Sequence, residues 1–188
     1  FHFFPCLAVF RFLAVKVEIN GNLLDKDGRI TTDPSKVVGY RLPTEAEWEY
    51  SARGGNKSKR YKYSGSDNVD EVAWYWQNSG DKYLTGDWDM DIVRENNCRT
   101  QEVGKKLPNE LGIYDMSGNI WEWCSDWYGD YSSSAQTNPY NSTAGSYRVN
   151  RGGSWYISAP YVRVAYRFLS SPTTAYSGLG FRVARTVP

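Results

Sequence analysis

The chain has 188 residues, of which 40% are hydrophobic and 23% charged, and its net charge is +1. This is the composition of a soluble globular protein, and we expect one domain over residues 1–188. Because 22 Lys and Arg balance 21 Asp and Glu, the sequence provides no basic surface for the phosphates of nucleic acid or for an anionic membrane. Nucleic acid is therefore excluded as a partner.

The first 15 residues are the longest apolar stretch, interrupted by Pro5 and Arg11. They are shorter than the roughly 20 residues that a membrane-spanning helix needs, so we expect a buried strand or helix and no transmembrane segment in this chain. No Met precedes them, and we expect the chain to begin within a larger precursor. Cys6, Cys98 and Cys124 lie far apart, which permits at most one disulfide and indicates no CxxC metal site.

The first regular elements are predicted from turn and capping residues. Residues 20–39 carry Asn-Gly, Asp-Gly and Asp-Pro pairs, which predict a hairpin or loop. Thr44 and Glu47 have the spacing of a capping box, and Gly54 stands where a helix would end. These signals predict a short helix over residues 45–53.

The remaining elements are predicted from periodicity. Residues 56–107 keep no period and carry scattered tryptophans, which predicts extended loops. A Ser-Gly-Asn turn at 117–119 precedes an aromatic run that is typical of a strand end buried in the core. Apolar and polar residues alternate in 161–167 and again in 180–185, so both segments are predicted to be half-buried strands. With 8 Trp, 15 Tyr and 17 Gly, the whole chain is expected to be rich in loops.

Three ordered blocks together resemble the formylglycine-generating enzyme (sulfatase-modifying factor) family. They are RLPTEAEWEYSARGG at 41–55, NELGIYDMSGNIWEWCSDWYG at 109–129 and RGGSW…GFRVAR at 151–185. The resemblance runs from about Tyr40 to Arg185, whereas residues 1–39 do not match the usual opening strands of the family. It implies an α+β, C-type-lectin-like fold of the formylglycine-generating-enzyme type. Such a fold has little regular secondary structure, a small antiparallel sheet with flanking helices, and a ligand surface in the C-terminal segment.

Catalysis is not expected, because the residues that active family members use are absent. Those members oxidise a substrate cysteine with two cysteines five residues apart, and the resemblance places these positions at Ala159 and Val164. Neither residue supplies the thiolate that would hold a copper ion. The one histidine, His2, leaves no Ser/His or Cys/His pair, and Glu45 and Glu49 are expected to be solvated on one helix face. We predict no catalytic residues, with a formylglycine-generating-type or other oxidoreductase as the alternative.

A C-terminal segment, residues 148–185, is predicted to bind a ligand. Its framework is Trp155, Arg163 and Arg167, and between these lie fifteen uncharged candidate binding residues. They are Tyr156, Ile157, Ser158, Pro160, Tyr161, Tyr166, Phe168, Leu169, Ser170, Ser171, Thr173, Thr174, Tyr176, Ser177 and Gly178. Antibody paratopes use the same residue types, because Tyr offers a large amphipathic contact at low entropy cost while Ser and Gly adapt. The alternative is that these aromatic residues form ordinary core.

The segment also resembles the variable proteins of diversity-generating retroelements, in which RVNRGGSW and LGFRV frame codons randomised at adenines. In that system asparagine AAY codons become NNY, which cannot encode Lys, Glu, Gln, Trp or Met, and none of the fifteen residues is of these types. The resemblance implies a display protein that binds a protein or glycan ligand and is located at a bacterial or phage surface or outside the cell.

A calcium ion is the one cofactor that the family resemblance suggests, and none is required for the predicted binding. Its ligands would be Asn119, the carbonyl group of Ile120 and Glu122, all of which supply oxygen atoms. In the alternative interpretation, Asn119 is a turn residue and Glu122 pairs with a framework arginine.

Overall fold

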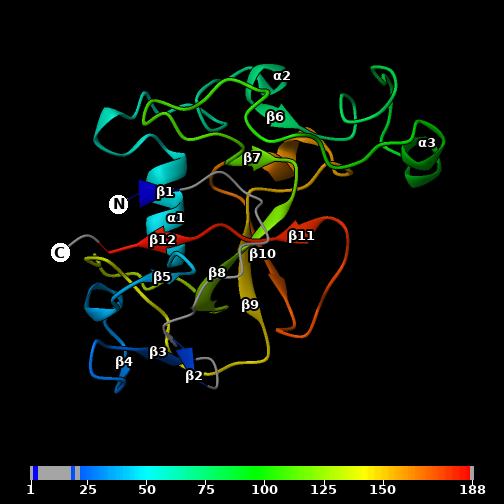
Figure 1. Cartoon of the computed structure of the whole chain (residues 1–188). Helices are drawn as coiled ribbons and strands as arrows, with labels where there is room; N and C mark the ends of the chain where they lie inside the picture. The colour runs from blue at the N-terminus through cyan, green and yellow to red at the C-terminus, as the bar shows by residue number, and fades with distance from the viewer. Residues whose placement is uncertain (1, 4–17, 20–21, 187–188) are drawn as a thin grey trace.

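The computed structural model of the chain describes residues 2–3, 18–19 and 22–186 (Figure 1). Short strands and short helices are connected by long loops, as the composition predicts. Of the apolar stretch at 1–15, only His2–Phe3 is described, as strand β1, so the prediction for the rest of that stretch lies outside the described residues. Cys6 also lies outside them, whereas Cys98 and Cys124 are free, buried thiols.

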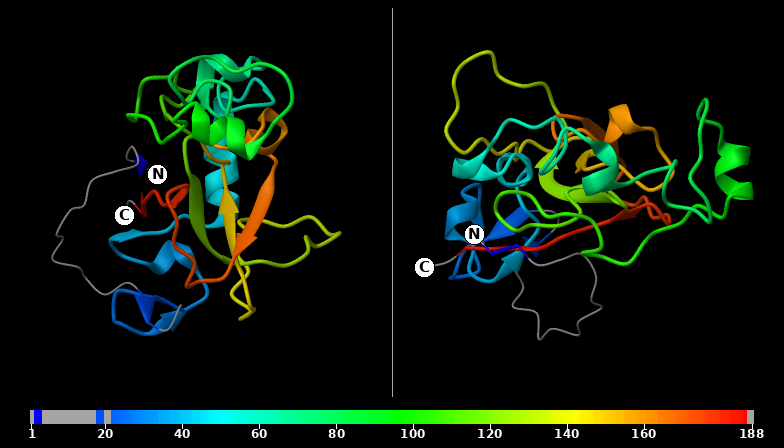
Figure 2. Two further views of the ribbon diagram at one scale, coloured as in Figure 1. Left: turned by 90° about the vertical axis from the view of Figure 1, so that its right-hand side faces the viewer. Right: turned by 90° about the horizontal axis from the view of Figure 1, so that it is seen from above.

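The central sheet has the strand order β10-β9-β8-β11. Its strands are β8 (Trp121–Trp127), β9 (Arg148–Arg151), β10 (Arg167–Ser170) and β11 (Leu179–Gly180). Neighbours pair antiparallel except β11, which runs parallel to β8. The left view of Figure 2 shows β8, β9 and β10 side by side. Two strands of the predicted binding segment, β10 and β11, therefore form the two edges of this sheet.

Three smaller sheets surround the central one. One has the order β1-β12-β5, with β12 at Ala184–Arg185 and β5 at Tyr40–Arg41. Another has the order β2-β3-β4, with β2 at Glu18–Ile19, β3 at Asn22–Leu24 and β4 at Ile30–Thr31. The last is the parallel pair of β6 (Ala73–Trp74) and β7 (Ser117–Gly118). Residues 20–39 were predicted to form a hairpin or a loop, and the antiparallel pairing of β3 with β4 shows a hairpin there. Because β1 pairs with β12, the two ends of the chain lie side by side (Figure 1).

Helix α1 (Glu45–Ala52) confirms the predicted capping box. The Thr44 side chain accepts from the backbone N–H of Glu47, whose side chain accepts from the backbone N–H of Thr44. Gly54 is left-handed, with φ +84°, just beyond the C-terminal end. This local device stabilises a helix of only two turns and sets its position against β8 and β9.

The prediction of loops alone over 56–107 was incomplete. The structure has α2 (Val69–Val72) and α3 (Met90–Glu95) in this region, capped by the side chains of Asn68 and Asp89. Both helices are too short to show a 3.6-residue period. Three 3-10 turns, at Pro34–Lys36, Gly55–Lys57 and Ala159–Val162, complete the helical structure of the described residues. None of the described helices has both the length and the apolar character needed to cross a bilayer.

Two apolar clusters lie under these elements. One is built around Val72, Tyr75, Trp76 and Val93, below α2 and α3. The other packs α1 onto the central sheet; its members are Trp48, Ala52, Met116, Cys124, Val149 and Val164. Val162 belongs to the first cluster and Val164 to the second, so two residues of the binding segment anchor it in both.

Neither predicted C-terminal strand has the predicted extent. In 161–167 the alternation of burial is present, but the backbone forms the 3-10 turn that Pro160 favours, and β10 starts only at Arg167. The alternation arises because Val162 and Val164 enter two different clusters. In 180–185 the strand is interrupted between β11 and β12, where Arg182 turns inward to a buried ion pair with Glu122.

Candidate binding site

Most of the fifteen candidate binding residues reach solvent. Tyr161 is 44% exposed, Phe168 42% and Tyr176 37%. Pro160, Thr173 and Ser177 are exposed as well, and the half-buried members are Tyr156, Ile157, Ser158, Tyr166, Leu169, Ser171 and Thr174. The alternative interpretation, in which the tyrosines and Phe168 are fully packed core, does not hold for these side chains.

Two of the fifteen candidates are buried and were wrongly assigned to the contact surface. Ser170 is 8% exposed and is the last residue of β10, where it pairs with Arg148. Gly178 is buried against Ser154 and Tyr156, and a Cβ atom there would lie 2.6 Å from each of them. Its carbonyl oxygen accepts from the backbone N–H of Trp121. Both residues shape the main chain of the segment rather than present a side chain.

Tyr161 and Phe168, but not Tyr176, line a hollow of about 500 Å³. Its lining residues are Trp88, Met90, Trp121, Tyr156, Ile157, Ser158, Tyr161, Tyr166 and Phe168. We call this the aromatic hollow. Six of the nine are candidates from the binding segment, and none carries a charge. A hollow of this size and character is typical of sites that bind an apolar group with few polar contacts.

Ring contacts hold the side chains of the aromatic hollow against one another. Trp121 stacks on Phe168, with ring centroids 5.1 Å apart, and lies 6.0 Å from Tyr166. Tyr161 meets Tyr166 edge to face at 5.0 Å. Such pairs favour one arrangement of the rings, which lowers the entropy lost when a ligand binds.

Two tyrosines of the binding segment, Tyr166 and Tyr176, have raised pKa values. Burial raises the pKa of Tyr166 above its ordinary value. Burial also raises the pKa of Tyr176, and a hydrogen bond with Tyr156 adds to this shift. The hydroxyl groups of Tyr166 and Tyr176 are therefore neutral at physiological pH.

Sequence reasoning missed three residues of the aromatic hollow: Trp88, Met90 and Trp121. Trp88 and Met90 precede and begin α3, and Trp121 begins β8, so all three lie outside the C-terminal segment. The indole N–H of Trp88 donates to the carbonyl oxygen of Tyr156 at 2.6 Å. The one signal in the sequence was a tryptophan at position 88 within a polar stretch, and nothing there indicated what it touches.

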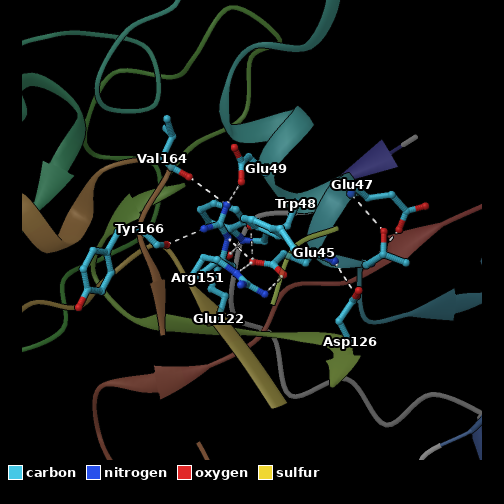
Figure 3. A network of polar contacts seen from close by, with 12 residues as sticks. Glu45, Glu47, Trp48, Glu49, Glu122, Asp126, Arg151, Val164 and Tyr166 are labelled. Atoms are coloured by element: carbon cyan, nitrogen blue, oxygen red, sulfur yellow. Dashed lines mark hydrogen bonds and ion pairs between the residues drawn. The ribbon is translucent and has the colours of Figure 1, made fainter. Parts of the chain in front are cut away.

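Side chains outside the candidate set hold the segment by its main chain. Arg151 donates to the carbonyl oxygens of Tyr166 at 2.7 Å and Val164 at 3.1 Å (Figure 3). The Ser79 hydroxyl donates to the carbonyl oxygen of Trp155 at 2.7 Å. These bonds, like that from Trp88 to Tyr156, do not depend on which side chain the held residue carries. The path of the main chain is therefore fixed separately from the surface it presents.

A cluster of charges lies behind the segment, between α1 and the sheet. Arg167 binds Glu45 through two hydrogen bonds, at 2.6 and 2.8 Å. Arg151 contacts both Glu45 and Glu49, as Figure 3 shows. The expectation that Glu45 and Glu49 are solvated was wrong: Glu45 is 6% exposed, and Glu49 pairs with Arg151 and Arg53. Their spacing on one face of α1 serves to receive arginines from β9 and β10.

The predicted framework residues also act through the main chain. The Arg163 side chain donates to the carbonyl oxygen of Pro160 at 2.7 Å. The indole N–H of Trp155 donates to the carbonyl oxygen of Ser177 at 3.4 Å, and Arg167 donates to that of Gly129 at 3.0 Å. Two of these bonds connect parts of the segment to each other, and the bond from Arg167 connects the segment to Gly129 outside it.

The predicted calcium ligands are engaged by protein groups. Both carboxylate oxygens of Glu122 accept from Arg182, and one also accepts from the Trp48 indole at 2.7 Å. The side-chain oxygen of Asn119 accepts from the backbone N–H of Gln101. The set Asn119, Ile120 and Glu122 therefore does not fit a calcium ion, and Glu122 is an arginine partner as in the alternative interpretation. In the part of the chain that the structure describes, no three acidic, Cys or His side chains gather as metal ligands.

Ala159 and Val164 face the interior. Val164 is 2% exposed within the α1 cluster, and Ala159 packs against the other cluster. Burial raises the pKa of the Cys124 thiol well above its ordinary value, and the charge of Asp126 adds to this. Cys124 is therefore a protonated packing residue.

The sequence matches the profile of the sulfatase-modifying factor enzyme 1-like domain over residues 16–187. Chaperone protein LppX of Paenibacillus barcinonensis is 46% identical over 148 residues, 79% of this chain and 50% of that protein. The formylglycine-generating enzyme of Streptomyces coelicolor is 36% identical over 160 residues, 80% of this chain and 48% of that enzyme.

A solved structure, Treponema denticola variable protein 1, superimposes with a TM-score of 0.67 at 38% identity, covering 85% of this chain and 51% of that one. This similarity confirms the predicted C-type-lectin-like fold of the formylglycine-generating-enzyme type. The chain spans about half the length of each of these relatives.

Proposed function

The chain belongs to the sulfatase-modifying factor enzyme 1-like domain family, and we propose that it uses this fold to bind a ligand and not to catalyse a reaction. The observation that carries the proposal is the aromatic hollow. The main chain that bears its rings is held in place by hydrogen bonds from Trp88 and Arg151. An interface of this kind gains its affinity from buried aromatic anchors.

The arrangement supports binding because the main chain of the segment is ordered before any ligand arrives. Ordering a loop and its side chains on binding costs free energy, roughly 0.5–1.5 kcal/mol for each side chain that becomes fixed. Arg151, Ser79 and Trp88 hold the main chain, and the rings of Tyr161 and Tyr166 already contact each other. Much of the free energy needed to order the segment is therefore spent when the protein folds and not when the ligand binds.

Diversification by a retroelement is the finer part of the proposal. It is supported by the similarity to Treponema denticola variable protein 1 and by the restricted residue types of the fifteen candidates. Main-chain anchoring supports it further, because a side chain can change without loss of these hydrogen bonds. From the resemblance to variable proteins of diversity-generating retroelements, we also propose that the protein is located at a bacterial cell surface or outside the cell.

Tolerance of the surface to change is the direct test. We would randomise Tyr156, Tyr161, Tyr166, Phe168 and Tyr176 together, display the library, and measure the melting temperature of random members and their binding to one chosen antigen. Folded members with scattered sequences, some of which bind, are the expected result. If nearly every member is unfolded, the rings are structural and the proposal fails. In the source genome, a near-identical repeat that differs from the gene only at adenines would identify the retroelement.

The absence of catalysis is tested with copper. Ala159 and Val164 offer no thiolate, so we expect no tight, thiol-dependent copper binding and no oxidation of a cysteine-containing peptide. Either activity would favour the oxidoreductase alternative.

A further inference from the structure

One wall of the aromatic hollow comes from outside the C-terminal segment. Trp88 and Met90 line it together with Tyr156, Tyr161 and Phe168, although some seventy residues of sequence separate the two groups. Trp88 is 45% exposed and is fixed in place by its hydrogen bond to the Tyr156 carbonyl oxygen. Because that bond reaches the main chain, Trp88 keeps its position whichever side chain stands at 156.

The lining side chains decide what the hollow can accept. They include no carboxylate, guanidinium, ammonium or carboxamide group, and the indole N–H of Trp88 is committed to Tyr156. The remaining polar groups of the lining side chains are the hydroxyls of Ser158 and of three tyrosines and the indole N–H of Trp121. A charged ligand group would lose its water and gain no opposite charge. A sugar would bury several hydroxyl groups, and each one left without a partner costs about 1–3 kcal/mol. Burying one apolar side chain instead gains about 1.5–3 kcal/mol.

We propose that Trp88 and Met90 form a fixed wall against which the aromatic hollow clamps an uncharged, apolar or aromatic side chain of a polypeptide partner. This inference rests on the proposed function and names its ligand class. Tryptophan is the residue type most enriched among the strongest contacts of protein interfaces. Methionine is flexible and adapts to differently shaped partners. A fixed wall of these two residues therefore suits many ligands, while the segment opposite selects among them.

The ligand class is tested with small probes on the full chain. In a 15N-labelled sample, we would follow the indole N–H resonances of Trp88 and Trp121 while adding N-acetyl-tryptophanamide, N-acetyl-leucinamide, N-acetyl-aspartamide or methyl glucoside. We expect saturable shifts with the first two probes and none with the last two. Saturable shifts with the glucoside alone would assign the hollow to glycans, and no shift with any probe would show that it holds no such group; either result overturns the inference.

The fixed wall is tested by substitution. Trp88→Ala should weaken binding of N-acetyl-tryptophanamide at least about ten-fold, the effect of losing one strong interface contact. The matched control is Tyr147→Ala, which removes a ring that is 47% exposed outside the hollow and should leave affinity unchanged. Melting temperatures identify any variant that is unfolded, in which case Trp88→Phe replaces it, with a smaller loss expected.

The variants also separate this inference from the proposed function, with Trp121 as the reporter. If Trp88→Ala has no effect while Tyr161→Ala and Tyr166→Ala weaken binding, the fixed wall is wrong and the binding segment stands. If Trp88→Ala weakens binding while neither tyrosine variant does, the segment is not the binding surface and the proposed function falls.

Discussion

Replacing Arg151 with methionine tests whether the charge cluster holds the binding segment. The Arg151 side chain is fully buried, contacts Glu45 and Glu49, and donates to the carbonyl oxygens of Val164 and Tyr166. Methionine keeps a similar unbranched shape and removes all of these polar contacts. We expect a less stable protein whose binding segment opens more often.

The magnitude follows from what is left unpaired. Removing one partner of a buried ion pair costs about 3–5 kcal/mol, because the remaining charge stays buried. Here Glu45 keeps Arg167 and Glu49 keeps Arg53, which reduces the cost. Each carbonyl oxygen left without a donor adds about 1–3 kcal/mol if it stays buried. We expect a net loss of about 3–5 kcal/mol, which lowers the melting temperature of a chain of this size by roughly 6–20 °C.

Thermal and urea unfolding would measure the loss, and amide hydrogen exchange would locate it. Exchange should rise across residues 163–168 more than in α1, because the glutamates of α1 keep Arg53 and Arg167 as partners, whereas the carbonyl oxygens of Val164 and Tyr166 lose their donor. The matched control is Arg94→Met, which breaks an exposed ion pair with Asp91 and should melt with the wild type. If Arg151→Met melts with this control, or if exchange rises evenly, the cluster does not hold the segment and the reasoning is refuted.

Three further predictions concern other parts of the structure. Burial raises the pKa of Asp126 to about 6, so the folded protein binds a proton more readily than the unfolded chain, and this residue lowers stability as pH rises from about 4 to 6. Asp126→Asn should remove this pH dependence of the free energy of unfolding, measured in urea. Equal pH dependence in the variant and the wild type would contradict the prediction. A chelator should leave the melting curve unchanged, because Glu122 and Asn119 are engaged by protein groups, whereas a lower melting temperature would restore a calcium site. Gly178→Ala should cost about 1–3 kcal/mol in chemical unfolding, because its Cβ would meet Tyr156 and Ser154, whereas exposed Ser177→Ala should be neutral.

Local signals predicted local structure well. The Thr44 and Glu47 capping box and the glycine at 54 act within a few residues of the helix they delimit, and α1 has the expected start. The hairpin of β3 and β4 was likewise set by turn residues close in sequence. The same reasoning missed α2 and α3, because one turn of helix leaves no period to detect.

Contacts distant in sequence could not be predicted in this way. Alternation at Val162 and Val164 predicted a strand, but the alternation reflects two clusters on either side of a turn. The Glu45 and Glu49 pair looked solvated because two of its arginine partners, Arg151 and Arg167, lie more than a hundred residues away. Trp88 reaches the binding segment only through the tertiary fold. The family resemblance predicted that the binding surface lies in the C-terminal segment. The structure was needed to find that Trp88 and Met90 form the opposite wall of the aromatic hollow.

The alternation of side chains along β10 separates what can vary from what cannot. Arg167 points to Glu45 beside α1, so Phe168, the next residue, points to the opposite face, where it stacks on Trp121. Leu169 then returns to the side of Arg167, and Ser170 is buried at the strand end. A change at Phe168 therefore alters the aromatic hollow without touching the ion pair beneath, whereas Leu169 lies on the side of that ion pair. The fifteen candidates are thus unequal: within β10, only Phe168 can change the binding surface while the charges behind it keep the main chain in place.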